Sequence, residues 1–186
     1  MNQYSYKKIS FDDLIKRINK TENNKYKTFI NLYIDKYLSK FKINSLQDFI
    51  KRNISQLNFY KQYDSNCIIY FHYIVDIKQD KIIAIEKGLD ISDKFFEIKY
   101  LKNITIHPES IIYATNLYVD EEYRGKSLCK LLLNKMKSNS EKHFKKYIMC
   151  EIHNENIPSI KCHESIGFIK LDLISYPNTY FYILNL

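Results

Sequence analysis

Residues 117–133 read Leu-Tyr-Val-Asp-Glu-Glu-Tyr-Arg-Gly-Lys-Ser-Leu-Cys-Lys-Leu-Leu-Leu, an order typical of a strand that passes through an acidic turn into a helix. Gly125 stands between Arg124 and Lys126, where this helix should begin. Free N–H groups at a helix start attract anions, and a glycine lets a phosphate approach the backbone closely. The stretch therefore predicts an anion-binding turn, and residues 120–122 before it are interpreted as a solvated turn rather than as part of an active site.

Strands and helices alternate around this turn. Ile111–Val119 and Tyr147–Ile152 have the composition of strands, and Gly125–Ser138 between them places its leucines on one helical face. A strand–helix–strand unit predicts two parallel strands with ligand sites at their carboxyl ends. Further strands are expected at Cys67–Val75, Ile82–Glu86, Phe95–Ile104, Phe168–Ile174 and Thr179–Leu186, with turns at Lys78–Lys81 and Gly88–Asp93.

The first third of the chain has a helical pattern. Ser10 and Ser45 each precede an aspartate by three residues, which is typical of a helix start, and apolar residues recur at helical spacing over Tyr26–Phe41. A short strand near Tyr4–Ile9 is a weaker expectation. We interpret residues 1–66 as a helical N-terminal part and 67–186 as a sheet core, together forming a single domain over 1–186.

A second informative segment spans Asn156–Phe168 and reads Asn-Ile-Pro-Ser-Ile-Lys-Cys-His-Glu-Ser-Ile-Gly-Phe. Asn156 can cap a helix that ends before Gly167. With the Arg124-Gly125 turn, this segment resembles the GNAT superfamily of acyl-CoA-dependent N-acyltransferases over about residues 111–170. The resemblance implies an α/β fold: a GNAT-like twisted mixed sheet flanked by helices, here with an enlarged helical N-terminal region.

The resemblance also implies a co-substrate, acetyl-CoA, bound where the two parallel strands splay apart, and no metal. Backbone groups of the first strand would pair with the pantetheine arm, and amides of the turn would hold the pyrophosphate. The cofactor-binding residues expected on this basis are Leu117, Tyr118, Val119, Arg124, Gly125, Lys126, Ser127, Leu128, Cys129, Asn156 and Ser159.

His163 is the expected catalytic residue. It occupies the position where the family usually has the tyrosine that protonates the departing thiolate, and an imidazolium can donate a proton near neutral pH. The alternative interpretation is an ordinary helix residue without a chemical role.

The sequence departs from the family pattern at several positions. Ser127 and Cys129 replace small glycine-type residues, and Cys129 narrows the space for a phosphate. The strand Ile111–Val119 contains no carboxylate to act as a general base. Glu151, Glu86 or Glu97 could act through water, and the sequence does not choose among them.

Composition limits the classes of protein to which the chain can belong. The chain has 186 residues, 45% of them apolar, and a formal charge of +8, which excludes a disordered chain but allows an anionic ligand, lipid or nucleic acid. A solvated lysine-rich surface explains the same charge. No apolar run reaches the 18 residues of a membrane span. No two of the four cysteines lie within three residues of each other, so no zinc knuckle or redox pair is expected, and reduced thiols in a cytoplasm fit best.

The function predicted from these features is N-acetyl transfer from acetyl-CoA to a primary amine of a small molecule. The alternatives are acetylation of a nucleotide-linked amino sugar or of a protein amine, and a non-catalytic family member that binds acyl-CoA. A nucleic-acid-binding protein ranks last because the basic N-terminal third carries no recognisable reading motif. The sequence fixes neither the acceptor nor the oligomeric state, monomer or homodimer.

Overall fold

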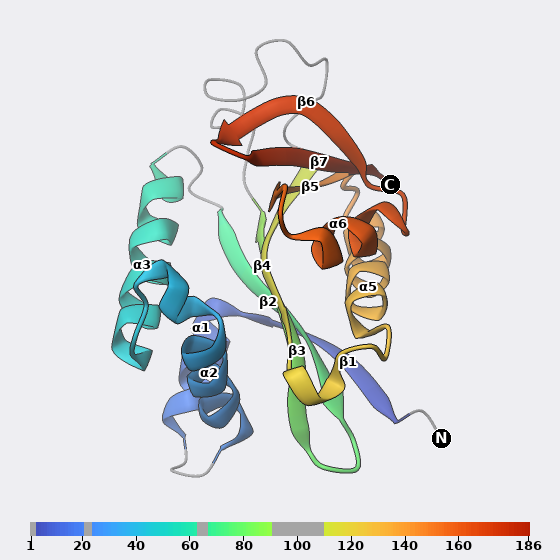
Figure 1. The fold of residues 1–186 in the computed structure, drawn as a ribbon. Coiled ribbons are helices and arrows are strands. Elements are labelled where there is room, and N and C mark those ends of the chain that lie inside the picture. The colour runs from blue at the N-terminus through green and yellow to red at the C-terminus, as the bar shows by residue number, and fades with distance from the viewer. Residues whose placement is uncertain (1–2, 21–23, 63–66, 91–109) are drawn as a thin grey trace.

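The computed structural model describes residues 3–20, 24–62, 67–90 and 110–186, whose seven strands form one mixed sheet in the order β1-β2-β3-β4-β5-β7-β6. Figure 1 shows α1, α2 and α3 on one side of this sheet and α5 and α6 on the other. The strands are β1 (Tyr4–Ser10), β2 (Ile68–Asp76), β3 (Lys81–Asp90), β4 (Ile111–Val119), β5 (Tyr147–His153), β6 (Ile169–Tyr176) and β7 (Thr179–Asn185). The helices are α1 (Phe11–Asn19), α2 (Lys25–Lys36), α3 (Leu46–Lys61), α5 (Leu128–Lys142) and α6 (Ile157–Glu164), with short 3-10 turns at Leu38–Phe41 and Glu121–Tyr123.

The expected parallel pair is present, and it splays. β4 and β5 are paired in parallel from Ile111 opposite Tyr147 to Ala114 opposite Cys150, and the pairing stops there. Beyond this point β5 continues to pair with β7, and β4 continues to pair with β3. The two strands therefore separate halfway along their length and leave the expected opening at their carboxyl ends.

A β-bulge in β4 lies at this opening. The register between β3 and β4 shifts so that Asn116 and Leu117 together face Glu86, and Asn116 has a left-handed backbone with φ of 60°. The hydroxyl of Tyr33 on α2 donates to the carbonyl of Asn116 at 2.9 Å, which holds the bulge in place. Bulges bend a strand and increase its twist. The bulge therefore turns the second half of β4 away from β5.

The N-terminal helices cover one face of the sheet. The starts predicted at Ser10 and Ser45 are confirmed, because each serine side chain accepts from a backbone N–H three residues later. Asn24, which the sequence pattern did not indicate, caps α2 in the same way, and α2 ends at Lys36, before the 3-10 turn at Leu38–Phe41. One buried apolar cluster includes residues of α1, α2 and α3 together with residues of β2, β4 and β7. Tyr118 on β4 lies in this cluster, with its ring centroid 5.5 Å from that of Tyr33. The helices thus share their core with the sheet.

Two expectations about the middle of the chain differ from the structure. The turn predicted at Gly88–Asp93 is wrong at its start, because β3 continues to Asp90. A Cβ at Gly88 would lie 3.2 Å from atoms of both His72 and Met136, so glycine serves the close packing of α5 rather than a turn. Residues 91–93 and the strand expected at Phe95–Ile104 lie outside the described residues.

Candidate active site

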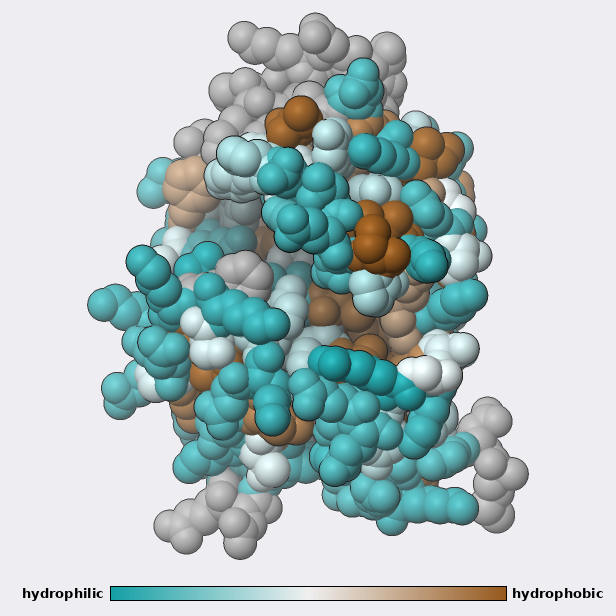
Figure 2. Space-filling view, in the orientation of Figure 1, coloured by the Kyte–Doolittle hydropathy of each residue, from teal (hydrophilic) through white to brown (hydrophobic). Residues whose placement is uncertain are grey.

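A cavity of about 750 Å³ opens where β4 and β5 separate. Residues 115–117 of β4 and 151–153 of β5 line its floor, and α3 and α6 line two of its sides. Figure 2 shows the surface hollowed on this face, between α3 and the side formed by β6 and α6. The volume lies within the range of about 300–1,000 Å³ usual for small-ligand pockets.

The turn before α5 presents unpaired backbone N–H groups. Gly125 and Ser127 both have left-handed backbones, with φ of 76° and 57°, and Ser127 caps the helix without a side-chain hydrogen bond. Within the described part of the chain, the N–H groups of residues 125–130 have no hydrogen-bond acceptor. A Cβ placed on Gly125 would meet no atom within 4 Å, so the space above the turn is open. The predicted anion-binding geometry is therefore present.

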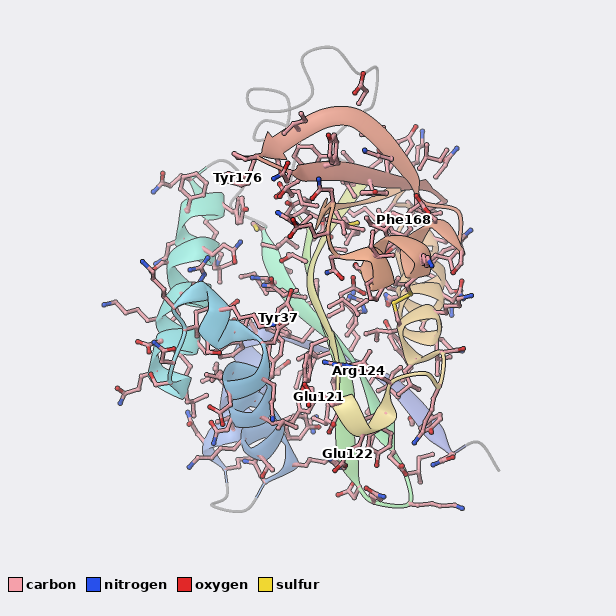
Figure 3. The ribbon with its side chains drawn as sticks, viewed as in Figure 1. Tyr37, Glu121, Glu122, Arg124, Phe168 and Tyr176 are labelled. Carbon is pink, nitrogen blue, oxygen red and sulfur yellow. A yellow bond between two sulfur atoms is a disulfide. The ribbon has the colours of Figure 1, made fainter. Side chains whose placement is uncertain are left out.

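The charged side chains of this turn have partners within it. A guanidinium nitrogen of Arg124 lies 3.6 Å from the Glu121 carboxylate, and the Lys126 ammonium lies 4.5 Å from the centroid of the Tyr123 ring. Figure 3 labels Arg124 and Glu121 on this turn. Asp120 differs from the solvated turn that the sequence predicts, because it is buried and pairs with the Lys81 ammonium at 2.8 Å. The acidic turn is therefore anchored to β3 through this ion pair, whereas residues 121 and 122 are exposed.

The helix α6 begins as predicted and carries His163 into the cavity. The Asn156 side chain accepts from the Ser159 N–H at 3.3 Å, and both residues line the cavity with His163. The Nδ1 atom of His163 lies 2.8 Å from the carbonyl oxygen of Ser159, and its ring packs edge-on against Phe168 at 4.9 Å. A carbonyl oxygen can only accept, so Nδ1 carries a proton. Burial lowers the pKa of His163 below its ordinary value, so the resting ring is neutral at pH 7.

Two of the three candidate general bases lie in the cavity lining. Glu86 on β3 is buried, and its Oε2 atom has no hydrogen-bond partner among the described residues. Burial raises the pKa of Glu86 to about 8. Glu151 on β5 forms a hydrogen bond with Tyr113. The third candidate, Glu97, lies outside the described residues.

The expectation that all cysteines are reduced is wrong for one pair. Cys129 at the start of α5 and Cys162 on α6 form a disulfide, with their Cα atoms 6.6 Å apart. These two cysteines are 33 residues apart and meet because the two helices pack together, so their spacing in the sequence does not reveal the pair. Cys67 and Cys150 are buried and form no disulfide. The disulfide joins the helix that follows the anion-binding turn to the helix that carries His163.

The structure places the expected site residues in different surroundings. Leu117, Asn156, Ser159 and His163 line the cavity. Residues 124–127 form the turn, in which the N–H groups of residues 125–127 have no acceptor among the described residues. Val119 packs against an apolar cluster, and Cys129 is held in the disulfide. The side chains of Tyr118 and Leu128 are buried in apolar clusters, so only their backbone groups are available to a ligand.

Sequence reasoning missed two cations of the cavity lining, Arg52 on α3 and Lys87 on β3. For Lys87 the sequence did contain an indication, because Glu86 and Lys87 are adjacent charged residues inside the otherwise apolar run Ile82–Leu89.

The described residues contain no group of three or more His, Cys, Asp or Glu side chains arranged to hold a metal ion. None of the helices in the described part of the chain is both long and apolar enough to span a membrane.

Comparisons with known proteins agree with this geometry. The model of the acetyltransferase (GNAT) family matches residues 55–168, whereas a search of curated proteins finds no match. A putative acetyltransferase, yncA from Salmonella typhimurium, solved with acetyl-CoA, has a TM-score of 0.61 at 13% identity and covers 100% of this chain and 95% of its own. NAA60 from Arabidopsis thaliana, solved with a bisubstrate analogue, has a TM-score of 0.61 at 14% identity over 98% and 97% of the two chains. A phosphinothricin acetyltransferase from Sinorhizobium meliloti, solved with AcCoA, has a TM-score of 0.59 at 13% identity. The match covers 100% of this chain and 89% of that one.

At these identities the solved structures establish the fold, and the family model establishes the class of protein. The mixed sheet with its splayed parallel strands and the match over residues 55–168 lead to one conclusion: the chain belongs to the acetyltransferase (GNAT) family of acyl-CoA-dependent enzymes.

Proposed function

We propose that the protein transfers an acetyl group from acetyl-CoA to a primary amine of a small molecule. The observation that carries the proposal is the splay of β4 and β5, because it opens an unpaired backbone edge of β4 onto a cavity lined by His163. The size of that cavity favours a small acceptor over a protein surface.

The anion-binding turn supplies the place for the pyrophosphate. The free N–H groups of residues 125–130 point to an anion, and the dipole of α5 adds to the attraction. The N–H and carbonyl groups of Leu117–Val119 on the open edge would pair with the amides of the pantetheine arm. This arrangement directs the thioester toward the end of the cavity that contains Asn156, Ser159 and His163.

The proton path uses a carboxylate and the histidine. The acceptor enters as an ammonium ion, and Glu86 is the buried group placed to take the first proton in its ionised form, which its pKa of about 8 makes the minority form at pH 7. The free amine then attacks the thioester carbonyl, and the new C–N bond leaves a second proton on nitrogen. A neutral His163 ring takes that proton on Nε2 and returns it to the sulfur as the C–S bond breaks. His163 thus serves as the donor to the thiolate, and its proton comes from the amine.

The test separates binding from chemistry. Acetyl-CoA should raise the melting temperature of the protein, and a panel of small amines should show release of free thiol. Glu86→Gln should lower turnover at pH 7 while the acetyl-CoA shift remains, and Glu141→Gln is the matched control, because Glu141 is exposed on α5 and does not line the cavity. A melting curve that millimolar acetyl-CoA leaves unchanged would overturn the proposal.

A further inference from the structure

We propose that the acceptor amine also carries an anionic group, a carboxylate or a phosphate, which Lys87 and Arg52 bind at the α3 side of the cavity. The inference rests on the proposed function, because it describes the acceptor of that same reaction.

Lys87 is a buried cation in the cavity lining. Its side chain is 7% exposed, and its Nζ atom donates to the Gln56 side-chain carbonyl on α3 at 2.7 Å. Among the described residues it has no other hydrogen-bond partner and no carboxylate within ion-pair distance. Taking an ammonium ion out of water costs several kcal/mol unless an opposite charge compensates it. A neutral amide does not provide that charge, so the charged form of Lys87 is uncompensated among the described residues.

Arg52 adds a second cation at the same place. It lies one helical turn before Gln56 on α3, lines the cavity and forms no ion pair with a described acidic residue. Burial, and then the nearby Arg52 guanidinium, lower the pKa of Lys87 to about 7. Two like charges held together repel each other, and an anion between them removes the repulsion. Arginine and lysine are also the side chains that bind carboxylate and phosphate groups most strongly.

The cavity lining also contains acidic side chains. Glu86 and Glu151 are its two carboxylates, and they come from β3 and β5, beside the opening between the strands. An acceptor with an ammonium at one end and an anion at the other matches both sets of charges. Because Arg52 is exposed, the anion lies toward the mouth of the cavity and the amine toward His163. Amino acids and phosphorylated amino sugars have this chemistry.

Matched pairs of acceptors test the proposal. Each pair shares one amine and differs only in the anion: an amino acid and its amide, phosphoethanolamine and ethanolamine, glucosamine 6-phosphate and glucosamine. The acidic member of at least one pair should have a kcat/KM at least tenfold higher. The carboxylate and phosphate pairs distinguish the two anions. Equal rates for both members of every pair would overturn the inference and leave the acetyltransferase proposal intact.

Variants locate the effect. Arg52→Gln and Lys87→Met should reduce the preference for the acidic acceptor by raising its KM, while the acetyl-CoA melting shift stays unchanged. Lys51→Gln is the control, because Lys51 is an exposed neighbour on α3 that does not line the cavity. Lys87→Met should also keep or raise the melting temperature, since it removes an uncompensated buried charge. A fall in melting temperature with an unchanged acceptor preference would show that Lys87 is structural.

Product binding provides a readout that needs no turnover. An N-acetylated amino acid should bind more tightly than its N-acetylated amide, and Arg52→Gln should abolish the difference. The binding of N-acetylglucosamine 6-phosphate and of N-acetylglucosamine gives the same comparison of affinities for a phosphate. If acetyl-CoA binds but no anionic product is preferred, the anion site is wrong. If the anionic product is preferred while no amine is acetylated, the anion site holds and the proposed function fails.

Discussion

His163 and Ser159 are joined within one turn of α6, where the Nδ1 proton of the ring is donated to the backbone carbonyl at 2.8 Å. This bond fixes the tautomer and leaves Nε2 as the atom that exchanges protons. Removal of the ring nitrogens should therefore stop proton transfer without moving the helix.

His163→Phe should lower turnover by roughly 10²–10⁴-fold, the usual contribution of a general acid or base. The dissociation constant of acetyl-CoA should change little, because the cofactor is expected to bind mainly through the backbone of residues 117–129. His163→Tyr restores a proton donor and should retain more activity than phenylalanine. If the phenylalanine variant equals the wild type from pH 6 to 9, His163 has a structural role only.

Gly125→Asp should abolish the melting shift caused by acetyl-CoA, because its carboxylate would face the pyrophosphate above the turn. Gly125→Asn is the matched control, since asparagine has the same shape, no charge and tolerates the left-handed backbone found here. The asparagine variant should keep most of the shift. A loss of the shift in both variants would assign the effect to backbone strain rather than to charge.

Reduction of the Cys129–Cys162 disulfide should destabilise the protein. The bond closes a loop of 33 residues, for which chain entropy predicts about 3–4 kcal/mol of stabilisation. Denaturant unfolding with and without dithiothreitol should show this difference in the wild type. In the double variant Cys129→Ala/Cys162→Ala, the reductant should have no effect, since the other two cysteines form no disulfide.

The stability of the protein should fall in acid because of His72. Burial, together with the Lys8 ammonium, lowers the pKa of His72 from 6.5 to about 3, and the side chain lies 2.5 Å from the Tyr6 hydroxyl. Below pH 6.5 His72 therefore binds a proton in the unfolded chain but stays neutral in the folded chain. Each such proton lowers the free energy of unfolding by about 1.4 kcal/mol per pH unit. The loss should extend from about pH 6.5 down to pH 3.

The variant His72→Gln should have a shallower acid limb than the wild type in urea titrations between pH 7 and 4. His143→Gln is the control because His143 is exposed. Parallel curves for His72→Gln and the wild type would contradict the assignment.

Deletion of residues 1–60 tests the prediction of a single domain. The shared apolar cluster loses Phe29, Tyr33 and Phe49, which are almost fully buried. The remainder should be insoluble or lack a cooperative unfolding transition. A fragment of residues 61–186 that unfolds cooperatively and binds acetyl-CoA would make the N-terminal part a separate module.

Local sequence patterns predicted the parts of this structure that depend on local chemistry. The capping serines, the Asn156 cap and the strand–turn–helix around Gly125 depend on neighbours within a few residues. The parallel pairing of β4 and β5 also followed from the order of the elements, whereas their splay was expected only from the family resemblance and depends on the bulge at Asn116.

The features that the sequence did not reveal depend on tertiary contacts. Gly88 looked like a turn residue because its close approach to Met136 involves a helix some fifty residues further along the chain. The partner of Cys129 lies on another helix, and the pairing of Lys87 with Gln56 joins a strand to a helix 31 positions earlier. Burial of a lysine is visible only when the surrounding elements are in place.

The unpaired half of β4 has a consequence for the behaviour of the protein in solution. Open strand edges are templates for aggregation, and here the edge beyond Ala114 has no neighbouring strand among the described ones. A ligand that supplies amide groups would act as the missing strand of the sheet. Resistance to aggregation should therefore depend on ligand concentration, which light scattering during slow heating would measure.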